Sequence, residues 1–421
     1  MSRKITPQPS CVDPFEPGMI SMAEALARIA GRVRAVRACE RLPIRDCLNR
    51  VNNEAVKSPR NVPPRPNSAM DGWAIAHASL VDGEIVELDE IGTAYAGKPF
   101  TGECAAGQCV RIMTGALIPE GTDTVIMQEA AEIAGGKIRI DADHRAGENI
   151  RRAGEDVAEG DVVLGAGLRL SPADLGVLAS LGLSQLQVRR KPVVGFFSTG
   201  DELVSVGEPL EPGMIYDSNR YSLHGMLSRL PVDIVDLGVV RDNPEAMREA
   251  LADGASRADL IISTGGVSVG EADYIKPALA DLGKTEFWKI AIKPGRPLTF
   301  GEIGNSIFMG LPGNPVAVMV TFHQFVLPVI ELLSGASPRP PVLVPARSLE
   351  SLRKKPGRTE FQRGVASLGE DGRWQVGRTG KQGSGILTSM SRANCFIVLP
   401  DDNDGVEPGD EVSIQFLDWS I

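Results

Sequence analysis

Two kinds of charged side chain in this sequence could act together at one site. Asp201 and Glu202 directly follow an apolar run, and carboxylates in such a position can hold Mg²⁺ or transfer protons. Lys289, Lys293 and Arg296 lie in a short basic segment that also contains two prolines and a glycine. Lysine and arginine bind tetrahedral anions, arginine through a planar fork of donors. Together these residues suit metal-assisted chemistry on a phosphoanhydride.

The basic segment, residues 289–297, is the strongest candidate for an anion site. The chain carries a formal net charge of −10, so an anionic substrate would need cations gathered locally. Its prolines and glycine hold Lys293 and Arg296 in a rigid turn. A solvated run of charges is the alternative, but the surrounding residues are apolar. We therefore predict an oxyanion site here and name residues 289–297 the cationic turn.

A glycine-rich segment, residues 265–273, could bring backbone N–H groups close to the same anion. It follows a predicted strand and leads into a helix start, where anions often bind. Many ordinary strand-to-helix turns look alike, so the glycines alone are weak support. Asp273 lies at the end of the segment and makes a ligand role the favoured interpretation.

Three other positions each have an ordinary structural alternative. Asp71, in the polar loop 67–74, is either a turn residue or a ligand of a metal or of water. Asp201 could cap a helix instead of binding a metal. Residues 312–314, Pro-Gly-Asn, are typical of a tight turn, which does not exclude contact with a ligand.

Composition disfavours several classes of protein. Aromatic residues are only 5% of the chain and the net charge is acidic, so neither nucleic acid nor a membrane surface is expected as a partner. The six cysteines form no Cys-x-x-Cys pair, which predicts reduced, mostly structural thiols and no zinc site. A P-loop motif is absent, and the four histidines lie in no catalytic motif. Residues 1–20 do not read as a signal peptide, and the longest apolar stretches look too short to span a membrane, so we expect a cytoplasmic protein.

The elements that must position these residues are predicted from apolar periodicity. A chain of 421 residues should form several domains. Short apolar runs between glycine and proline turns predict a β-rich insert at residues 58–156, and similar runs predict a small β domain at 336–421. Between them, residues 190–335 should form an αβ domain with a parallel sheet, because strands and helices alternate. The predicted strands are residues 192–197, 232–240 and 259–263, and the predicted helices are residues 217–230 and 243–256. Ligands bind at the carboxyl ends of such strands.

Two more helices are expected outside the αβ domain. One begins at Ser21, where Glu24 completes the sequence pattern of a capping box. The other covers about residues 172–181 and could pack back against the first.

Several segments, taken in order, resemble one known family. They cover the chain from about Pro17 to the C-terminus, and only the ordered set is specific. The segments are Asn67-Ser-Ala-Met-Asp-Gly, Arg111-Ile-Met-Thr-Gly-Ala, Gly147-Glu-Asn-Ile-Arg-Arg, Gly154-Glu-Asp, Ser198-Thr-Gly-Asp-Glu-Leu, Asp217-Ser-Asn, Gly265-Gly-Val-Ser-Val-Gly-Glu-Ala-Asp and Leu311-Pro-Gly-Asn-Pro-Val. In this arrangement the sequence resembles the molybdopterin molybdenumtransferase family, which includes the C-terminal domain of gephyrin.

The resemblance implies an α/β plus β multidomain protein. Its first domain would be discontinuous, residues 15–57 with 157–189, followed by the insert, a molybdopterin-binding αβ sandwich and a C-terminal β-barrel-like domain. It further implies a homodimer whose substrates are adenylylated molybdopterin and molybdate, and whose products are the molybdenum cofactor and AMP. Mg²⁺ would hold the pyrophosphate for attack by water, and the substrate's dithiolene sulfurs would take the metal. The adenylyltransferase acting upstream, and molybdoenzymes or chaperones downstream, are implied as partners.

Residue by residue, the resemblance also assigns roles. The catalytic positions are Asp71, Glu202, Asp242, Asp273, Lys289 and Lys293. Metal ligands among them are Glu202, Asp242 and Asp273. The ligand-binding positions are Thr114, Asp156, Ser198, Thr199, Gly200, Asp201, Gly265, Gly266, Ser268, Gly270, Arg296, Pro297, Pro312, Gly313, Asn314, Arg363 and Ser384. For molybdate itself the hypothesis is a pocket formed by Ser268, Lys293, Arg296, Arg363 and Ser384.

Departures from the family pattern and two rival functions stay open at this point. Trp73 stands where the family usually has tyrosine, residues 116–119 lack the commoner early proline, and Arg296 replaces a frequent lysine. One rival is a molybdopterin adenylyltransferase, which shares the αβ domain but lacks long β-rich flanks. The other is a non-catalytic scaffold like gephyrin, against which the acidic and basic residues at the matched motifs argue.

Overall fold

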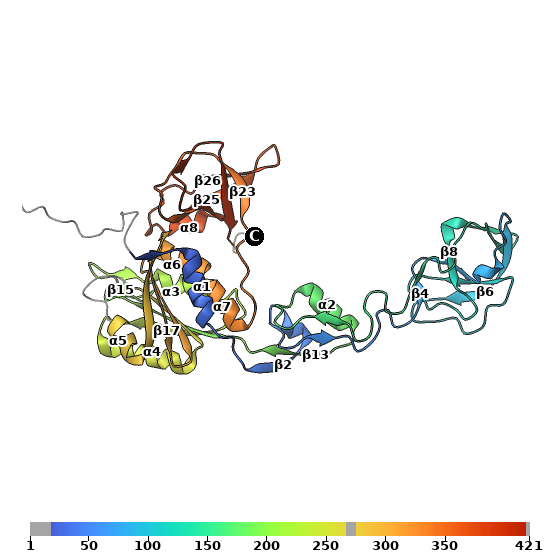
Figure 1. Cartoon of the computed structure of the whole chain (residues 1–421), viewed down its shortest axis with the longest axis horizontal. Coiled ribbons are helices and arrows are strands. Elements are labelled where there is room, and N and C mark those ends of the chain that lie inside the picture. Colours follow the sequence, from blue (N-terminus) through green and yellow to red (C-terminus); the bar gives the residue numbers. More distant parts are fainter. Residues whose placement is uncertain (1–17, 267–274, 418–421) are drawn as a thin grey trace, which may run out of the picture. The chain divides into compact units, whose positions relative to one another are not determined.

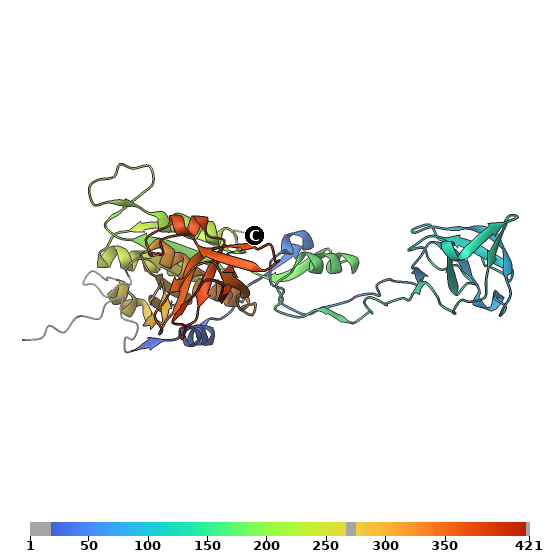
Figure 2. The same cartoon turned by 90° about the horizontal axis from the view of Figure 1, so that it is seen from above.

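The computed structural model describes residues 18–266 and 275–417, which form two compact units (Figures 1 and 2). The core unit comprises the described residues up to Glu40 and from Arg189 onward. The insert unit is Arg41–Val188. Within the core unit we call the seven-stranded sheet and its helices the αβ domain, and the strands of residues 344–416 the barrel.

The αβ domain is built on one mixed sheet with the strand order β1-β19-β21-β22-β18-β14-β17. The strands are β1 (Met19–Ile20), β14 (Val193–Thr199), β17 (Asp233–Val240), β18 (Leu260–Thr264), β19 (Gly283–Ile290), β21 (Pro297–Ile303) and β22 (Ser306–Leu311). The predicted parallel arrangement is confirmed for β22, β18, β14 and β17. It is wrong for β21, which is antiparallel to β19 and β22, because short turns rather than helical crossovers connect these three strands.

The carboxyl ends of the parallel strands finish level with one another. In register, Ser198 pairs with Thr264, and Thr264 pairs with Leu311. β19 runs in the same direction as β22, because β21 is antiparallel to both. The cationic turn, which follows Ile290 at the end of β19, therefore lies at this same carboxyl edge of the sheet.

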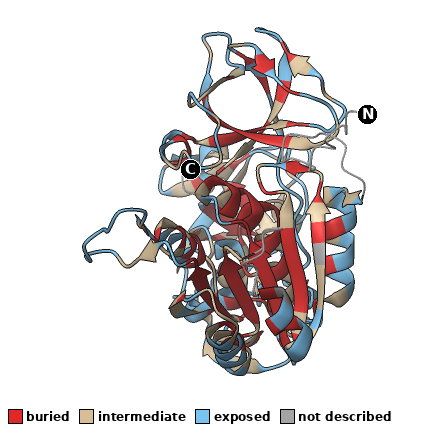
Figure 3. Ribbon diagram, turned by 90° about the vertical axis from the view of Figure 1, so that its left-hand side faces the viewer, coloured by how far each residue is buried: buried red, intermediate tan, exposed pale blue. Residues whose placement is uncertain are grey.

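Helices cover both faces of the sheet, and neighbouring side chains along β14 show why. Phe196 belongs to one apolar cluster and Phe197 to another, since successive residues of a strand point to opposite faces. Both clusters are fully buried, and Figure 3 shows burial concentrated in the sheet and the helices against it. The Phe197 side is covered by α4 (Pro244–Arg257) and α5 (Ile275–Leu282); the Phe196 side is covered by α1 (Met22–Arg32), α3 (Ser218–Leu227), α6 (Pro315–Thr321) and α7 (Leu327–Ser334).

Side-chain caps set the starts of three of these helices, whereas α6 and α7 begin without one. Ser21 accepts from the Glu24 backbone N–H at the start of α1, and Asn243 accepts from Ala246 at the start of α4. Asp217 caps α3 in the same way. α1 packs on α7 and β19 and so belongs to the core unit.

The sequence predicted that the longest apolar stretches are too short to span a membrane, and this prediction of length is wrong. The helical run Pro315–Ser334, which joins α6 and α7 through the π-helix η4 (Phe322–Val326), has a mean hydropathy of 1.9 over its most apolar window and is long enough to cross a bilayer. Its window is 78% buried inside the protein. The apolar residues are therefore explained by packing at the centre of the αβ domain.

The barrel confirms the predicted C-terminal β domain. Its strands are β23 (Val344–Ser348), β25 (Thr359–Leu368), β26 (Trp374–Arg378), β27 (Cys395–Leu399) and β29 (Glu411–Phe416). β25 pairs with both β26 and β27, which closes the five strands on themselves. The short strands β24 (Leu352–Arg353) and β28 (Gly405–Val406) pair with each other, and α8 (Thr388–Arg392) lies before β27.

A sixth strand joins the barrel sheet from the αβ domain. This is β20 (Ile292–Lys293), the middle of the cationic turn. It pairs in parallel with β25, so that Ile292 is opposite Thr359 and Lys293 is opposite Glu360. The pairing fixes the cationic turn against the barrel.

The insert unit contains the predicted β-rich region. Six strands form one sheet, in the order β8-β5-β7-β6-β10-β9. They are β5 (Gly72–Ile75), β6 (Val86–Ala94), β7 (Gln108–Ile112), β8 (Thr124–Met127), β9 (Ala131–Ala134) and β10 (Lys137–Ile140). The unit also holds α2 (Pro172–Ser180), which begins with a capping box between Ser171 and Asp174, and the strand pairs β3 (Val56–Lys57) with β12 (Val162–Leu164) and β4 (Asn67–Ser68) with β11 (Ile150–Arg151).

At the carboxyl edge of the sheet, the backbone of Gly265 leaves no space for a side chain. Its φ is +89°, and an added Cβ would overlap the Thr199 carbonyl oxygen at the end of β14. The G265A variant should therefore lower the free energy of unfolding by about 2–3 kcal/mol, from backbone strain and overpacking. Urea denaturation followed by circular dichroism measures this.

The matched control is G31A in helix α1. An added Cβ there has nothing within 4 Å, and alanine favours a helix, so stability should rise by about 0.5–1 kcal/mol. Unchanged stability in G265A would contradict the steric account of the Gly265 turn.

Candidate functional site

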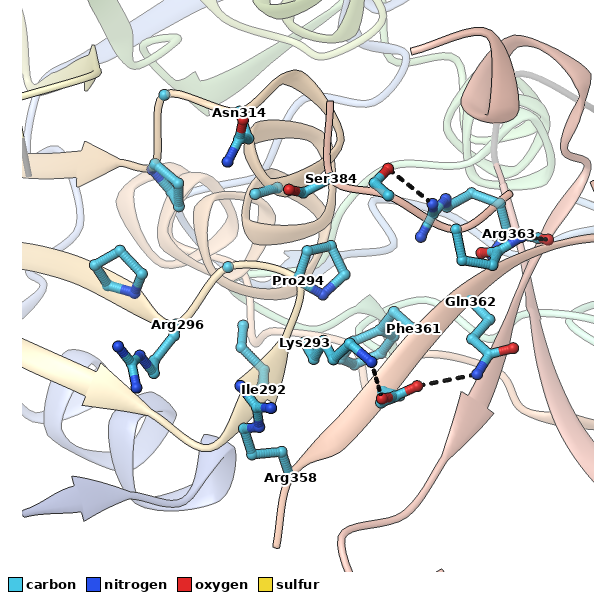
Figure 4. Close-up of a pocket in the computed structure, with 18 of the residues that line it drawn as sticks. Ile292, Lys293, Pro294, Arg296, Asn314, Arg358, Phe361, Gln362, Arg363 and Ser384 are labelled. Atoms are coloured by element: carbon cyan, nitrogen blue, oxygen red, sulfur yellow. Dashed lines mark hydrogen bonds and ion pairs between the residues drawn. The ribbon is translucent and has the colours of Figure 1, made fainter. Parts of the chain in front are cut away.

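A cavity of about 870 Å³ opens between the carboxyl edge of the αβ domain and the barrel (Figure 4). Its walls come from segments far apart in the sequence. The structure brings eleven of the predicted residues together in its lining: Gly265, Gly266, Lys289, Lys293, Arg296, Pro297, Pro312, Gly313, Asn314, Arg363 and Ser384.

The cationic turn is held in place from both sides. The Ile290 N–H donates to the Arg296 carbonyl at 2.8 Å, which closes the turn. Gly295, with φ +108°, passes so close to α6 that an added Cβ would lie 2.6 Å from Thr321 Cγ2. On the barrel side, Lys293 Nζ contacts Glu360 Oε1 at 2.5 Å. The sequence attributed the rigid turn to its prolines and its glycine; the structure adds the close approach of Gly295 to Thr321 and the contact of Lys293 with Glu360.

Arg363 is a buried cation with neutral partners. Its side chain is only 1% exposed, and its Nε and Nη2 donate to Ser389 Oγ at 3.0 Å and the Gly383 carbonyl at 3.1 Å. Burial lowers the pKa of Arg363 to about 10, because desolvation disfavours the charged form; the nearby Glu360 carboxylate partly opposes this. Both described side-chain hydrogen bonds go to neutral oxygens, so a buried positive charge faces the cavity without direct neutralisation. An anion in the cavity would supply the negative charge that neutralises Arg363.

The loop that carries Ser384 is tied to both domains. Gln382 Oε1 accepts from the Arg363 backbone N–H at 2.8 Å, which fixes the loop to β25. The Ser384 carbonyl accepts from Val316 N–H at 3.1 Å, in the first turn of α6. Ser384 and Arg363 therefore approach the cavity from one connected network, and Figure 4 shows both beside it.

Polar groups at the end of β14 form a second, neighbouring network. The Ser198 hydroxyl donates to Asp217 Oδ1 at 3.0 Å and lies 3.0 Å from the Thr264 hydroxyl. The Thr199 hydroxyl donates to Asp242 Oδ1. Asp217 is buried and is already the cap of α3, so its role is structural.

The predicted carboxylates next to this network, Asp201, Glu202 and Asp242, lie near one another but do not reach the cavity. Asp242 N–H donates to Asp201 Oδ1 at 3.3 Å, so the proposed helix cap at Asp201 is wrong: the residues after it form β15 (Leu203–Val204), and its carboxylate binds the segment after β17 instead. Gly200, with φ +153°, lets the exposed Glu202 carboxylate fold back over the backbone. Neither Glu202 nor Asp242 lines the cavity, although both belong to the same edge of the sheet.

Three predicted residues, Ser268, Gly270 and Asp273, lie outside the described residues. Among residues 18–266 and 275–417, no three His, Cys, Asp or Glu side chains converge in a way that could hold a metal alone.

The insert unit brings two of its predicted residues together. Asp71 Oδ1 accepts from the Thr114 backbone N–H at 2.7 Å and from the Thr114 hydroxyl at 2.8 Å. These two bonds lower the pKa of Asp71, so its carboxylate is charged at neutral pH. Asp156 is exposed, and its backbone N–H donates to the Val62 carbonyl.

The tryptophan that departs from the family pattern has a clear structural role. The Trp73 ring is buried, and its Nε1 donates to Glu90 Oε2 at 2.9 Å. The Arg111 guanidinium lies 4.3 Å from the ring centroid, which is a favourable cation–π distance.

Sequence reasoning missed six polar residues in the cavity wall: Arg353, Arg358, Glu360, Gln362, Arg378 and Gln382. A signal was present for two of them. Arg358 lies directly before β25 and Glu360 is its second residue, so two charged residues stand at alternate positions where this apolar strand begins.

Known proteins share this architecture along the whole chain. Residues 20–182 match the MoeA N-terminal region (domains I and II), residues 195–332 match a probable molybdopterin binding domain, and residues 345–417 match the MoeA C-terminal region (domain IV). The solved molybdopterin biosynthesis MoeA protein of Pyrococcus horikoshii is 30% identical, covers 95% of this chain and 100% of its own, and has a TM-score of 0.81.

Curated relatives agree with these matches. The molybdopterin molybdenumtransferase of Haemophilus influenzae is 43% identical over 94% of this chain and 98% of its own length. The corresponding protein of Bacillus subtilis is 34% identical over 90% of both chains. Since the match extends over all domains at this identity, the chain belongs to the molybdopterin molybdenumtransferase family of transferases.

Proposed function

We propose that this chain takes molybdenum from molybdate and inserts it into adenylylated molybdopterin, with Mg²⁺-assisted release of AMP. The observation that carries the proposal is the buried Arg363 guanidinium, which lines a large cavity and makes its side-chain hydrogen bonds, among the described residues, to neutral oxygens only. A tetrahedral dianion supplies the missing charge, and the arginine fork matches its oxygens. The names of the relatives supply the identity of the metal and of its acceptor.

The oxyanion would lie among Lys293, Arg296, Arg363 and Ser384, which Figure 4 shows around one cavity. The hydrogen bonds of Arg363 to Ser389 and Gly383 fix the plane of the guanidinium before the anion arrives. Lys293 is held in the same way by Glu360. Preorganised donors bind an anion without first paying to order flexible side chains.

The organic substrate has room in the same cavity. Pockets for ligands of drug size measure roughly 300–1,000 Å³, and this one, at about 870 Å³, is much larger than a single oxyanion needs. Gly265, Gly266 and Gly313 line it and carry no side chain of their own. Such backbone can approach the flat ring or the phosphate groups of a substrate closely.

The donors at the end of β14 suit Mg²⁺. Magnesium prefers carboxylate oxygens and is usually held by one or two of them, with waters and substrate phosphates completing the shell. Asp242, whose carboxylate is oriented by the Thr199 hydroxyl, and the exposed Glu202 would hold the ion. When bound, the ion would offset charge on the pyrophosphate and so favour attack by water.

Two of the protein's buried thiols are poor receivers of the metal. Burial raises the pKa of Cys109 and of Cys395 to about 12, so both thiols are protonated at neutral pH. Only a thiolate is an effective metal ligand. The dithiolene sulfurs of the organic substrate would therefore bind molybdenum while the cations of the cavity hold the oxyanion in place.

One assay tests the proposal as a whole. The protein is incubated with adenylylated molybdopterin, molybdate and Mg²⁺, and AMP and active cofactor are measured together. We expect both products, with active cofactor formed only when molybdate is present. Consumption of ATP with unadenylylated molybdopterin would instead identify an adenylyltransferase, and the absence of both reactions would support a scaffold.

The R363M variant tests the oxyanion site. Removing the guanidinium should weaken molybdate binding by about 2–5 kcal/mol, on the order of 30- to several-thousand-fold, because the main buried positive charge is lost. Isothermal titration calorimetry measures the affinity. The control is R347M, which removes a cation of the same barrel that pairs with Asp371 on the surface, and it should bind normally. Equal affinity in R363M and the wild type would exclude Arg363 from the site.

The D242N variant tests the acidic side of the reaction separately. AMP release should fall by about 10²-fold or more, because the proposed Mg²⁺ site loses a charged ligand, whereas molybdate affinity should stay within about twofold of the wild type. The matched control is D236N, on β17 itself, where the carboxylate pairs with Arg220. Normal AMP release by D242N would remove this carboxylate from the mechanism.

We also propose, from the family resemblance, that the chain works as a homodimer in the cytoplasm. Analytical ultracentrifugation at assay concentrations should show a single species with the mass of two chains. A monomer that catalyses the complete reaction would contradict the homodimer.

A further inference from the structure

Glu360 is an unexpected residue in the wall of an anion site. Its side chain is almost fully buried, at 7% exposure, and its position on β25 faces the cavity. The other charged residues in the described lining are all cations: Lys289, Lys293, Arg296, Arg353, Arg358, Arg363 and Arg378. A carboxylate among them repels the same anion that the cations attract, so its presence requires a reason.

The contacts of Glu360 point to Lys293. One carboxylate oxygen contacts Lys293 Nζ at 2.5 Å, and the other accepts from Gln362 Nε2 at 2.9 Å. The pairing of β20 with β25 places Lys293 directly opposite Glu360. The Lys293 side chain is 53% exposed, whereas its partner Glu360 is buried, so the carboxylate is the fixed member of the pair.

The charge of Glu360 also acts on other cations of the barrel. It opposes the desolvation that lowers the pKa of Lys354 and of Arg363. Lys354 is itself buried and donates to the Asn403 carbonyl at 2.8 Å. Glu360 thus pairs with Lys293 and helps to keep two further cations, Lys354 and Arg363, protonated.

We infer that Glu360 is a positioning residue of the oxyanion site: it fixes the Lys293 ammonium at the cavity wall and offsets one positive charge, so that a dianion is held loosely enough to be passed on. The inference rests on the proposed function, because it concerns the same oxyanion. A transferase gains nothing from holding its cargo more tightly than the transition state for its transfer. The buried Glu360 carboxylate pairs with Lys293 and lowers the net positive charge of the cavity wall, while every cationic side chain of the wall stays in place.

The E360Q variant tests the charge without removing the contact. Glutamine has the same size and can still accept from Lys293, but it leaves the cavity one unit more positive. Molybdate should bind about tenfold more tightly, since like-signed repulsion is removed, while the rate constant of metal transfer at saturating molybdate falls. A purely structural role predicts no tightening. The control D371N neutralises an exposed carboxylate that pairs with Arg347 elsewhere on the barrel, and it should leave both quantities unchanged.

A second pair of variants makes the inference independent of how well E360Q folds. K293M leaves the buried carboxylate without its partner, so molybdate affinity should fall by more than tenfold. The double variant K293M/E360Q removes that unpaired charge and should bind molybdate more tightly than K293M alone. Equal or weaker binding by the double variant would overturn the inference, because the charge of Glu360 would then not oppose binding of the anion once Lys293 no longer offsets it.

The outcomes separate this inference from the proposed function. If the wild type binds molybdate, R363M does not, and E360Q is unchanged, the oxyanion site stands and the role of Glu360 falls. If the wild type itself binds no molybdate by calorimetry, both are wrong. Tighter binding by E360Q with a slower transfer step supports both.

Discussion

The site depends on two residues that belong to the αβ domain in sequence and to the sheet of the barrel by hydrogen bonding. Ile292 and Lys293 lie within the turn between β19 and β21 of the αβ domain, yet they pair as strand β20 with β25 of the barrel. The sheet of one domain thus continues, through its own turn, into the sheet of the other. Together with the hydrogen bond from Val316 N–H to the Ser384 carbonyl, this pairing brings the cations of the turn and those of the barrel to one cavity.

Two cations near that junction differ in how their charge is compensated. Arg363 is buried, and desolvation makes its positive charge unfavourable until an anion arrives. Lys293 is neutralised in advance by Glu360. The pocket therefore combines one cation that demands a counter-ion with another that has one already. Such a combination attracts an oxyanion and still lets it go, which is what a transfer reaction needs.

Much of this arrangement could be predicted from the sequence, because local rules decide it. The strands β14 and β18 are continuous apolar runs, as buried parallel strands must be, and Asn243 followed by proline fixes the start of α4. The cationic turn stood out because its charges lie among apolar residues. Matching motifs to the family then located Arg363 and Ser384, whose own neighbourhood offers no pattern that names a ligand.

The features that sequence reasoning missed are those that long-range packing decides. The antiparallel direction of β21 depends on how two short turns fold, and the pattern of apolar residues is the same in either direction. Asp201 has the right type and place for a helix cap, but the chain continues into a strand and its carboxylate binds the Asp242 backbone. Glu360 was overlooked because its partner, Lys293, is distant in sequence and adjacent only through β20.

The closure of the barrel gives the junction a second significance. Sheets that end in an unpaired strand expose a row of free N–H and C=O groups, which can recruit a strand from another molecule. In the barrel, β25 meets β26 and β27 along most of its length, and β20 pairs with its first residues, Thr359 and Glu360. The turn that lines the cavity thus also covers the first residues of β25 against pairing with a strand of another chain.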